Sequence, residues 1–122
     1  MNRDNILFSV VICTYNRADL LRVAINSVCD QDLDRSHFEI IVVDNNSQDN
    51  TRDIVESYPS VKYVLEEKLG LSCARNAGIE NARGDIIAFI DDDADASIHW
   101  LAELLKVYDS CADAWAVGGE VL

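Results

Sequence analysis

Proline, glycine, aromatic residues and positive charge are all scarce in this chain of 122 residues. It has one Pro, five Gly, 7% aromatic residues and 10 Lys+Arg against 22 Asp+Glu, for a formal net charge of -12. Binding to nucleic acid depends on clustered cations that release counterions from phosphates, and the cations here are scattered singly, so we expect no nucleic-acid partner. With 49% hydrophobic residues, the composition predicts a single domain over residues 1–122.

Long hydrophobic runs and closely spaced cysteines are also missing. No apolar run reaches the roughly 18 residues that span a bilayer, and the first run, residues 6–13, lacks the features of a signal peptide. We therefore expect a cytoplasmic protein. The absence of any CxxC pair argues against a zinc or redox site, and we expect reduced, mostly buried thiols at Cys13, Cys29, Cys73 and Cys111.

Short apolar runs alternate with helical patterns along the chain. The runs are rich in Val and Ile and do not alternate with polar residues, which is typical of strands buried on both faces of a parallel sheet. We expect strands at residues 7–13, 39–44, 61–65, 85–91 and 114–117. Helices are expected at residues 18–30, around Ile54 and Val55, at 71–81, and after Ser97. This order predicts an α/β, doubly wound sheet with right-handed crossovers.

Three of these helices have candidate caps. Asn16 is placed to cap the first helix, whose apolar stripe comprises Leu20, Leu21, Ala24, Ile25 and Val28. The segment from Asn45 to Ser47 suits a turn and a cap for the second helix. Ser97 is expected to cap the last helix, with an apolar stripe at Ile98, Leu101, Leu104, Leu105 and Tyr108.

Polar residues follow three of the expected strands. Ligands of open α/β sheets bind outside the carboxyl ends of the strands, so these residues should line one edge of the sheet. They are Thr14, Tyr15, Asn16 and Arg17 after the first strand, residues 44–47 after the second, and Asp91, Asp92, Asp93 and Asp95 after the fourth.

The acidic segment at residues 91–95 predicts a cation site. Its four carboxylates repel one another unless they are solvated or neutralised, and Mg²⁺ or Mn²⁺ is the natural partner for such hard oxygen donors. An acidic loop that caps the next helix is the alternative, and the position at a strand end favours the cation site. An EF-hand is excluded, because Ala96 and Ala102 stand where Gly and Glu are required.

Two further residues suggest a nucleotide pocket when they are combined. Tyr15 is placed to stack on a planar base, and Asp44 to accept a hydrogen bond from an imide or amino group of that base. Arg75 has a planar fork that suits a diphosphate, although a salt bridge to one of the many acids explains it equally well.

Four ordered segments resemble the nucleotide-sugar glycosyltransferases of family 2, which have the GT-A fold. They read SVVICTYNR at residues 9–17, IIVVDNNS at 40–47, GLSCARNAG at 70–78, and GD at 84–85 leading into FIDDD at 89–93. Together they extend over nearly the whole chain. The resemblance implies a Rossmann-like, mostly parallel sheet flanked by helices in a three-layer α/β/α arrangement.

The resemblance also implies roles for individual residues. Thr14 and Tyr15 match the pair that holds the base, Asp44 the carboxylate that hydrogen-bonds uracil, and Arg75 the arginine near the nucleotide. Arg17 is expected to contact the substrate as well. Residues 91–93 match the DxD element, in which Asp92 reaches the ribose, and Asp93, with Asp91, coordinates the Mn²⁺ or Mg²⁺ that bridges the diphosphate.

The activity implied is metal-dependent, inverting transfer of a sugar from a UDP-sugar to a hydroxyl of a saccharide, lipid or protein acceptor. Because domains of this family are longer, we expect a truncated N-terminal part that binds the donor, with the general base beyond Leu122. The full-length protein is expected to associate peripherally with the inner face of the membrane. The last predicted strand, at residues 114–117, would offer an exposed edge for dimerisation.

Two alternatives come from other functional classes. A magnesium-binding receiver domain of a signalling pathway also gathers acids at strand ends, but it needs an Asp after the third strand, where this chain has Glu66, Glu67 and Lys68. A non-catalytic interaction domain remains open, although it leaves the grouping of Tyr15 with the acidic residues unexplained.

Overall fold

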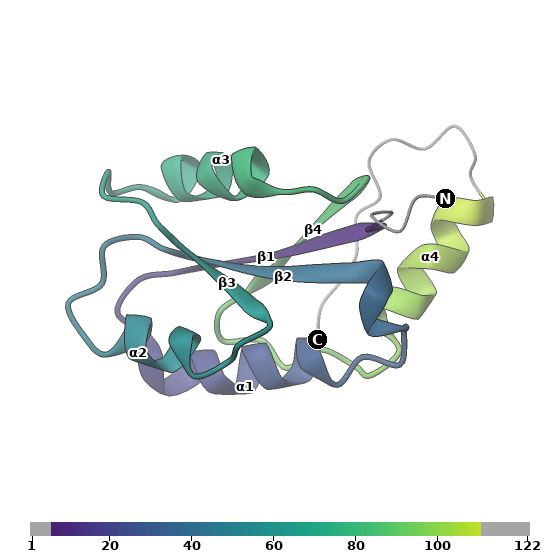
Figure 1. Cartoon of the computed structure of the whole chain (residues 1–122), viewed down its shortest axis with the longest axis horizontal. Coiled ribbons are helices and arrows are strands. Elements are labelled where there is room, and N and C mark those ends of the chain that lie inside the picture. Colours follow the sequence, from purple (N-terminus) through teal and green to yellow (C-terminus); the bar gives the residue numbers. More distant parts are fainter. Residues whose placement is uncertain (1–5, 111–122) are drawn as a thin grey trace.

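The computed structural model describes residues 6–110, which form a four-stranded parallel sheet with helices on both faces (Figure 1). The order of the strands in the sheet is β3-β2-β1-β4. Along the chain the elements are β1 (Phe8–Thr14), α1 (Ala18–Cys29), η1 (Arg35–His37), β2 (Phe38–Asp44), α2 (Thr51–Glu56), β3 (Val61–Leu65), α3 (Leu71–Asn81), β4 (Ile86–Asp91) and α4 (Trp100–Ser110). The predicted α/β class is confirmed, and the strand expected at residues 114–117, with its dimer edge, lies outside the described residues.

Strand β1 occupies the centre of the sheet, between β2 and β4. Phe8 is in register with Phe38 on one side and with Ile86 on the other. Successive strands are added on one side of β1 up to β3, after which the chain crosses to the other side to form β4. The strand order therefore reverses beside β1, and a crevice at the carboxyl ends of the strands is expected there.

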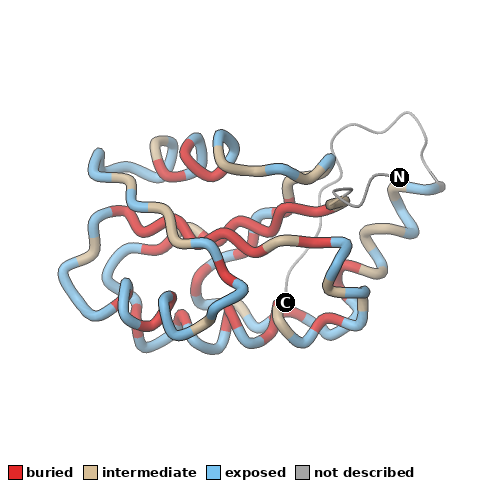
Figure 2. The backbone as a smooth tube through the Cα atoms, in the orientation of Figure 1, coloured by how far each residue is buried: buried red, intermediate tan, exposed pale blue. Residues whose placement is uncertain are grey.

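The two faces of the sheet carry cores of unequal size. Helices α1 and α2 lie on one face and α3 on the other (Figure 1), and Figure 2 shows buried positions concentrated along β1 and β2. The larger core includes Phe8, Val10, Ile12, Leu21, Ile25, Ile40, Val42 and Leu101. The smaller core comprises Val11, Ile41, Val43, Ala74 and Ala77. Both faces of β1 and β2 are thus buried, which explains why their apolar residues do not alternate with polar ones.

Helix α3 packs very close to the sheet because it presents small residues. An added Cβ at Gly78 would lie 2.5 Å from Cγ1 of Val11. Ala74 and Ala77, one turn apart on the same helix, are also buried against β1 and β2. This close contact places the start of α3 beside the carboxyl ends of the central strands.

The cap predicted for α1 is wrong, although its boundaries are close to those expected. The helix begins at Ala18, whose amide donates to Oδ2 of Asp49 at 3.1 Å. Asn16 instead adopts φ 53° and accepts a hydrogen bond from the Gln48 amide through Oδ1. Leu20, which was assigned to the apolar stripe, is exposed, because it points away from the sheet-facing side of α1.

The expected cap of α2 is also wrong. Helix α2 begins at Thr51, and Asp49 Oδ1 accepts from both the amide and the hydroxyl of Thr51, at 3.1 and 2.5 Å. The hydroxyl of Ser47 instead accepts from the amide of Asn16, at 2.9 Å. The loops after β1 and β2 are therefore joined to each other, and one carboxylate serves the starts of both helices.

The last helix begins later than the sequence predicted. Helix α4 begins at Trp100, so Ile98 lies before it and is exposed, whereas Leu101 is fully buried. The buried Gln31, just after α1, holds this start, because its Oε1 accepts from the Leu101 amide at 2.8 Å and its Nε2 donates to the Ser97 carbonyl. Ser97 Oγ accepts from the His99 amide at 3.2 Å.

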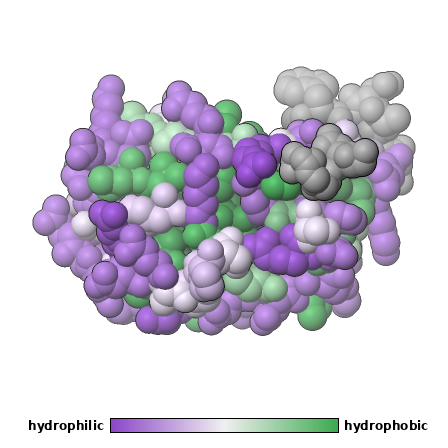
Figure 3. All heavy atoms as spheres, in the orientation of Figure 1, coloured by the Kyte–Doolittle hydropathy of each residue, from purple (hydrophilic) through white to green (hydrophobic). Residues whose placement is uncertain are grey.

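The surface is mostly hydrophilic on the side shown in Figure 3, with hydrophobic residues gathered between α3 and the sheet. Among the described helices, none has the length and apolar character needed to cross a membrane. Cys13, Cys29 and Cys73 carry free thiols and are half-buried rather than buried as expected, and Cys111 lies outside the described residues.

Candidate functional site

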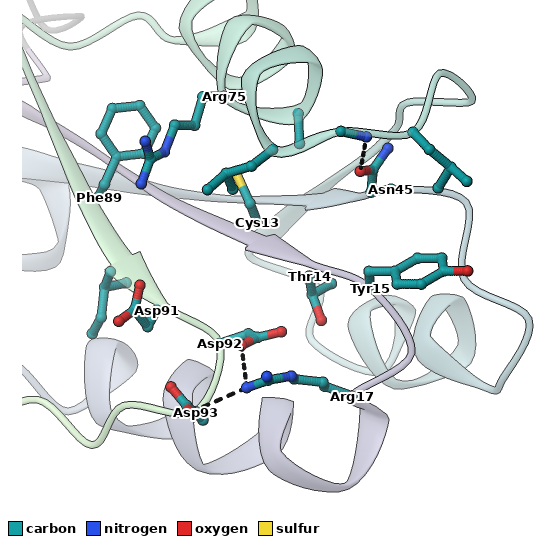
Figure 4. Close-up of a pocket in the computed structure, with 15 residues that line it drawn as sticks. Cys13, Thr14, Tyr15, Arg17, Asn45, Arg75, Phe89, Asp91, Asp92 and Asp93 are labelled. Carbon is teal, nitrogen blue, oxygen red and sulfur yellow. Dashed lines mark hydrogen bonds and ion pairs between the residues drawn. The ribbon is translucent and has the colours of Figure 1, made fainter.

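A crevice of about 670 Å³ opens at the carboxyl ends of the strands. This volume lies within the range of pockets that bind small molecules and cofactors. Its walls come from the ends of β1 and β4, the residue after β2, and the segment that leads into α3 (Figure 4). The lining comprises Cys13, Thr14, Tyr15, Arg17, Asn45, Leu69, Gly70, Leu71, Ala74, Arg75, Phe89, Ile90, Asp91, Asp92 and Asp93.

Nearly all of the expected site residues meet in this crevice. They come from segments that are far apart in sequence and are Thr14, Tyr15, Arg17, Arg75, Asp91, Asp92 and Asp93. The register between β1 and β4 explains part of this convergence, because Cys13 pairs with Asp91 at the ends of these strands. The rule that polar residues after parallel strands share one edge thus accounts for these side chains except that of Arg75, which lies on α3. The individual roles of all of them stay predictions.

Asp44 is the one expected residue that is not among the described residues lining the crevice. It is 3% exposed, and both of its carboxylate oxygens accept hydrogen bonds from the chain itself. Oδ1 accepts from the Ser47 amide at 2.8 Å, and Oδ2 accepts from the Tyr63 hydroxyl at 2.7 Å. A contact between Asp44 and a base stays a prediction, and each carboxylate oxygen retains a further lone pair that could accept a hydrogen bond.

Asn45 lines the crevice. It was expected at this edge of the sheet with residues 44–47, but as part of a turn and helix cap rather than as a ligand-binding residue. Side chains alternate between the two faces of a strand, and β2 buries Ile41 and Val43 under α3. The next residue on that same face is Asn45. Its amide group donates to the carbonyls of Glu66 and Lys68 and accepts from the Gly70 amide at 3.0 Å. Alternation was the signal that could have identified it.

The crevice has an aromatic side chain near each end. Tyr15 is half exposed and lies at the end nearer Asn45 (Figure 4). At the opposite end, the guanidinium of Arg75 lies over the ring of Phe89, 5.6 Å from its centroid. The exposed face of Tyr15 is available to stack on a planar group, and Arg75 places a positive charge over the far end of the crevice.

The acidic side of the crevice is partly neutralised by one arginine. Nη1 of Arg17 lies 3.1 Å from Oδ2 of Asp93 and 3.5 Å from Oδ1 of Asp92 (Figure 4). Burial raises the pKa of Asp92. A hydrogen bond from the Thr14 side chain and the charge of Arg17 oppose this shift, and the carboxylates of Asp93 and Asp91 reinforce it. The segment therefore concentrates negative charge where one carboxylate is already poorly solvated.

The donor set fits a hard divalent cation that is completed by ligands from outside the chain. Within residues 6–110, no three His, Cys, Asp or Glu side chains converge in the manner of an all-protein metal site. Mg²⁺ and similar ions are commonly held by one or two carboxylates together with substrate phosphates and water, which matches Asp91 and Asp93 in an open crevice. The buried Oγ1 of Thr14 lies beside Asp92 at the same side of the crevice.

The thiol of Cys13 is expected to react slowly although it lines the crevice. Burial raises its pKa to about 11, with Arg75 opposing and Asp92 reinforcing the shift. Because the thiolate is the nucleophile, we expect alkylation by iodoacetamide at pH 8 to be roughly a hundredfold slower than for an ordinary thiol. The rate should rise about tenfold per pH unit up to pH 11. Mass spectrometry of the peptide containing Cys13 measures this, with urea-unfolded protein as the control, and equal rates at pH 8 would contradict it.

Sequence comparison assigns the chain to a family. Residues 9–119 match the family described as glycosyl transferase family 2. The chain belongs to this family. It is 39% identical over 98 residues to the glycosyltransferase AglE of Haloferax volcanii, covering 76% of this chain and 32% of AglE. It is 38% identical over 118 residues to the validoxylamine A glucosyltransferase of Streptomyces hygroscopicus subsp. jinggangensis, covering 93% of this chain and 28% of that enzyme.

Solved structures agree with the family 2 assignment and with the GT-A form of the α/β fold. TarS 1-349 of S. aureus superposes with a TM-score of 0.82 at 30% identity, over 88% of this chain and 33% of TarS. The mannosyltransferase PcManGT of Pyrobaculum calidifontis, solved with GDP-Man and Mn²⁺, gives a TM-score of 0.77 at 29% identity, over 85% of this chain and 32% of PcManGT. This family 2 chain therefore spans about a third of the length of these relatives.

Proposed function

We propose that this chain forms the donor-binding part of a glycosyltransferase that takes a sugar from a nucleoside diphosphate sugar. The observation that carries the proposal is the crevice at the strand ends, where Tyr15, Arg75 and residues 91–93 meet. TarS has been solved with UDP and with UDP-GlcNAc, and PcManGT with GDP-Man and Mn²⁺, which supports a nucleotide-sugar donor. Family membership disfavours the receiver-domain alternative.

In the proposed complex, each side chain of the crevice binds a different part of the donor. Tyr15 stacks on the base, Arg75 pairs with phosphate oxygens, and Asp92 accepts a hydrogen bond from the ribose. Asp93 and Asp91 hold Mn²⁺ or Mg²⁺, which supplies Lewis-acid neutralisation of the charge that develops on the leaving diphosphate. We propose that the base of the donor is uracil. We also propose that the transfer inverts the configuration at the anomeric carbon.

The attacking hydroxyl must lose its proton on the face of the sugar opposite the leaving group. The described acids at this crevice are those proposed to bind the donor, so we assign the general base to the remainder of a longer protein. That remainder also chooses the saccharide, lipid or protein acceptor. The 122-residue chain is thus proposed to bind the donor without completing the transfer.

Calorimetric titration of UDP into the purified chain tests this proposal. We expect binding of UDP in Mn²⁺ that weakens at least about tenfold in EDTA, which removes the cation. We expect a similar loss in the Asp93→Ala variant, because the cation then loses a ligand. Asp95→Ala is the matched control, since Asp95 is an exposed acid two residues away and outside the described lining of the crevice. GDP titrated in parallel tests the proposed preference for uracil.

Three results would contradict the proposal. Equal affinity for UDP in Mn²⁺ and in EDTA would refute the metal dependence. Tighter binding of GDP than of UDP would refute the base preference. Absence of binding to any nucleotide by a folded sample would refute the donor site itself.

A further inference from the structure

Arg17 occupies a position that a divalent cation would need. A single nitrogen, Nη1, contacts both Asp93, at 3.1 Å, and Asp92, at 3.5 Å. The side chains of Arg17 and Asp93 are each 50% exposed, whereas that of Asp92 is 11% exposed. One positive charge of the chain therefore already bridges two of the three carboxylates at the end of β4.

The backbone of Arg17 is held firmly, although its side chain is half exposed. Its carbonyl accepts from the amides of Leu20 and Leu21, both at 3.0 Å, which fixes it at the first turn of α1. The preceding residue, Asn16, is tied by hydrogen bonds to Ser47 and Gln48 in the next loop. The guanidinium thus reaches the acidic segment from a fixed backbone position, while the side chain itself retains room to move.

The contact neutralises the acids but is replaceable. Exposed ion pairs of this kind are weak, since water screens them and the long side chain loses freedom when it is held in place. A divalent ion brings twice the charge and takes carboxylate oxygens as direct ligands, so it competes successfully when phosphate oxygens complete its shell. Two cations in contact with the same carboxylate oxygens repel each other, so occupation by one disfavours the other.

Thr14 is a second polar residue at the same place. It is 3% exposed and lines the crevice, and its buried Oγ1 lies close enough to Asp92 to lower the pKa of that carboxyl. Figure 4 shows its hydroxyl on the side of Arg17 and Asp92, between Tyr15 and the acidic segment. Thr14 and Arg17 thus both favour the ionised form of Asp92, although burial of that carboxyl outweighs them.

We propose that Arg17 is an internal counter-cation that a divalent ion must displace from Asp93. This inference rests on the metal dependence of the proposed function. Arg17 keeps the affinity for the free metal low, so that the ion is retained mainly when a nucleoside diphosphate adds its own oxygens. The site then binds the metal weakly when no donor is present, and the metal and the donor bind together.

The test measures Mn²⁺ binding without nucleotide, from the electron paramagnetic resonance signal of the free ion. We expect Arg17→Gln to bind Mn²⁺ about threefold to tenfold tighter than the unsubstituted chain. Arg22→Gln is the matched control, because Arg22 is exposed on the same helix and lies outside the described lining, so it removes the same net charge at a distance. Its affinity should stay within about twofold of the unsubstituted chain. Circular dichroism checks that each variant is folded.

The outcomes separate this inference from the proposed function. If Asp93→Asn loses Mn²⁺ while Arg17→Gln, Arg22→Gln and the unsubstituted chain bind it equally, the metal site stands and the role of Arg17 is refuted. Weaker binding by Arg17→Gln also refutes it, since Arg17 would then support the ion rather than compete with it. If no variant binds Mn²⁺ with or without UDP, the metal dependence of the proposed function and the inference fall together.

Discussion

Replacing Gly84 by alanine is expected to lower the free energy of unfolding by about 3 kcal/mol, because the loop before β4 touches the backbone of β1 at this residue. An added Cβ would lie 2.7 Å from both the carbonyl carbon of Phe8 and the amide nitrogen of Ser9. These atoms belong to the buried central strand and cannot move aside, so the loop must withdraw. Withdrawal would break the hydrogen bond from the Gly84 amide to Ser9 Oγ, at 2.7 Å.

Urea unfolding followed by circular dichroism measures this effect. Arg83→Ala is the matched control, because Arg83 is exposed in the same loop and its backbone amide, which donates to Glu39 Oε2, is retained. We expect the control to change stability by less than about 0.5 kcal/mol. A Gly84→Ala variant as stable as the control would show that the loop can withdraw from β1 at little cost.

Replacing Asp49 by alanine is expected to cost about 3 kcal/mol as well, although the residue is exposed. Its carboxylate serves the starts of two helices, since Oδ2 accepts from the Ala18 amide and Oδ1 from the Thr51 amide. Each lost cap typically costs about 1 kcal/mol. The hydroxyl of Thr51, which is fully buried, would also lose its acceptor, a change that costs about 1–3 kcal/mol.

A double-mutant cycle isolates the contribution of the hydroxyl. In a Thr51→Val background, Asp49→Ala should cost about 1 kcal/mol less than in the unsubstituted chain, because no buried hydroxyl is left without a partner. Asp53→Ala, an exposed acid in the first turn of α2, is the control and should cost less than about 1 kcal/mol. Equal losses for Asp49→Ala and Asp53→Ala would mean that Asp49 acts only through its charge.

The contribution of Asp49 should also depend on pH with a definite sign. Partial burial raises its pKa, but the hydrogen bonds from Thr51 and Ala18 outweigh this effect, so its pKa in the folded chain is lowered. A lowered pKa means that the stabilisation is complete above the unfolded value of about 3.9 and is lost as the pH falls below it. The difference between the unsubstituted chain and Asp49→Ala should therefore shrink in acid.

The strands could be predicted because the signal for them is local. Runs of Val and Ile bounded by polar residues mark buried parallel strands. For the four strands within residues 6–110, the predicted ends differ from the observed ones by a single residue or not at all. The cap of α1 could not be predicted in this way. Capping rules look at the residues next to a helix, whereas the acceptor for the Ala18 amide is Asp49, a residue of the loop after β2. The cap of α2 is local, because Asp49 lies two residues before Thr51, and the same rules could have found it.

The residues that belong to the site were predicted better than the contacts among them. The strand-end rule brought Tyr15, Arg17 and the residues at 91–93 together, because it depends only on the parallel order of the strands. It does not say which face each side chain takes, so it did not distinguish Asn45, which lines the crevice, from Asp44, which is not among the described lining residues. It also does not reveal ion pairs between loops, such as that of Arg17 with Asp93.

The central position of β1 governs the order in which the molecule can assemble. Among the described strands no neighbours form a hairpin, since Phe8 pairs with Phe38 and with Ile86, and Ile40 pairs with Val61. Such distant pairings delay folding, because long loops must close before any ladder forms. During synthesis, one edge of β1 stays without its partner until β4 has been made. Cys13 meets Asp91 only at that stage, so the nucleotide that we propose for this crevice would stabilise the completed sheet and none of its earlier intermediates.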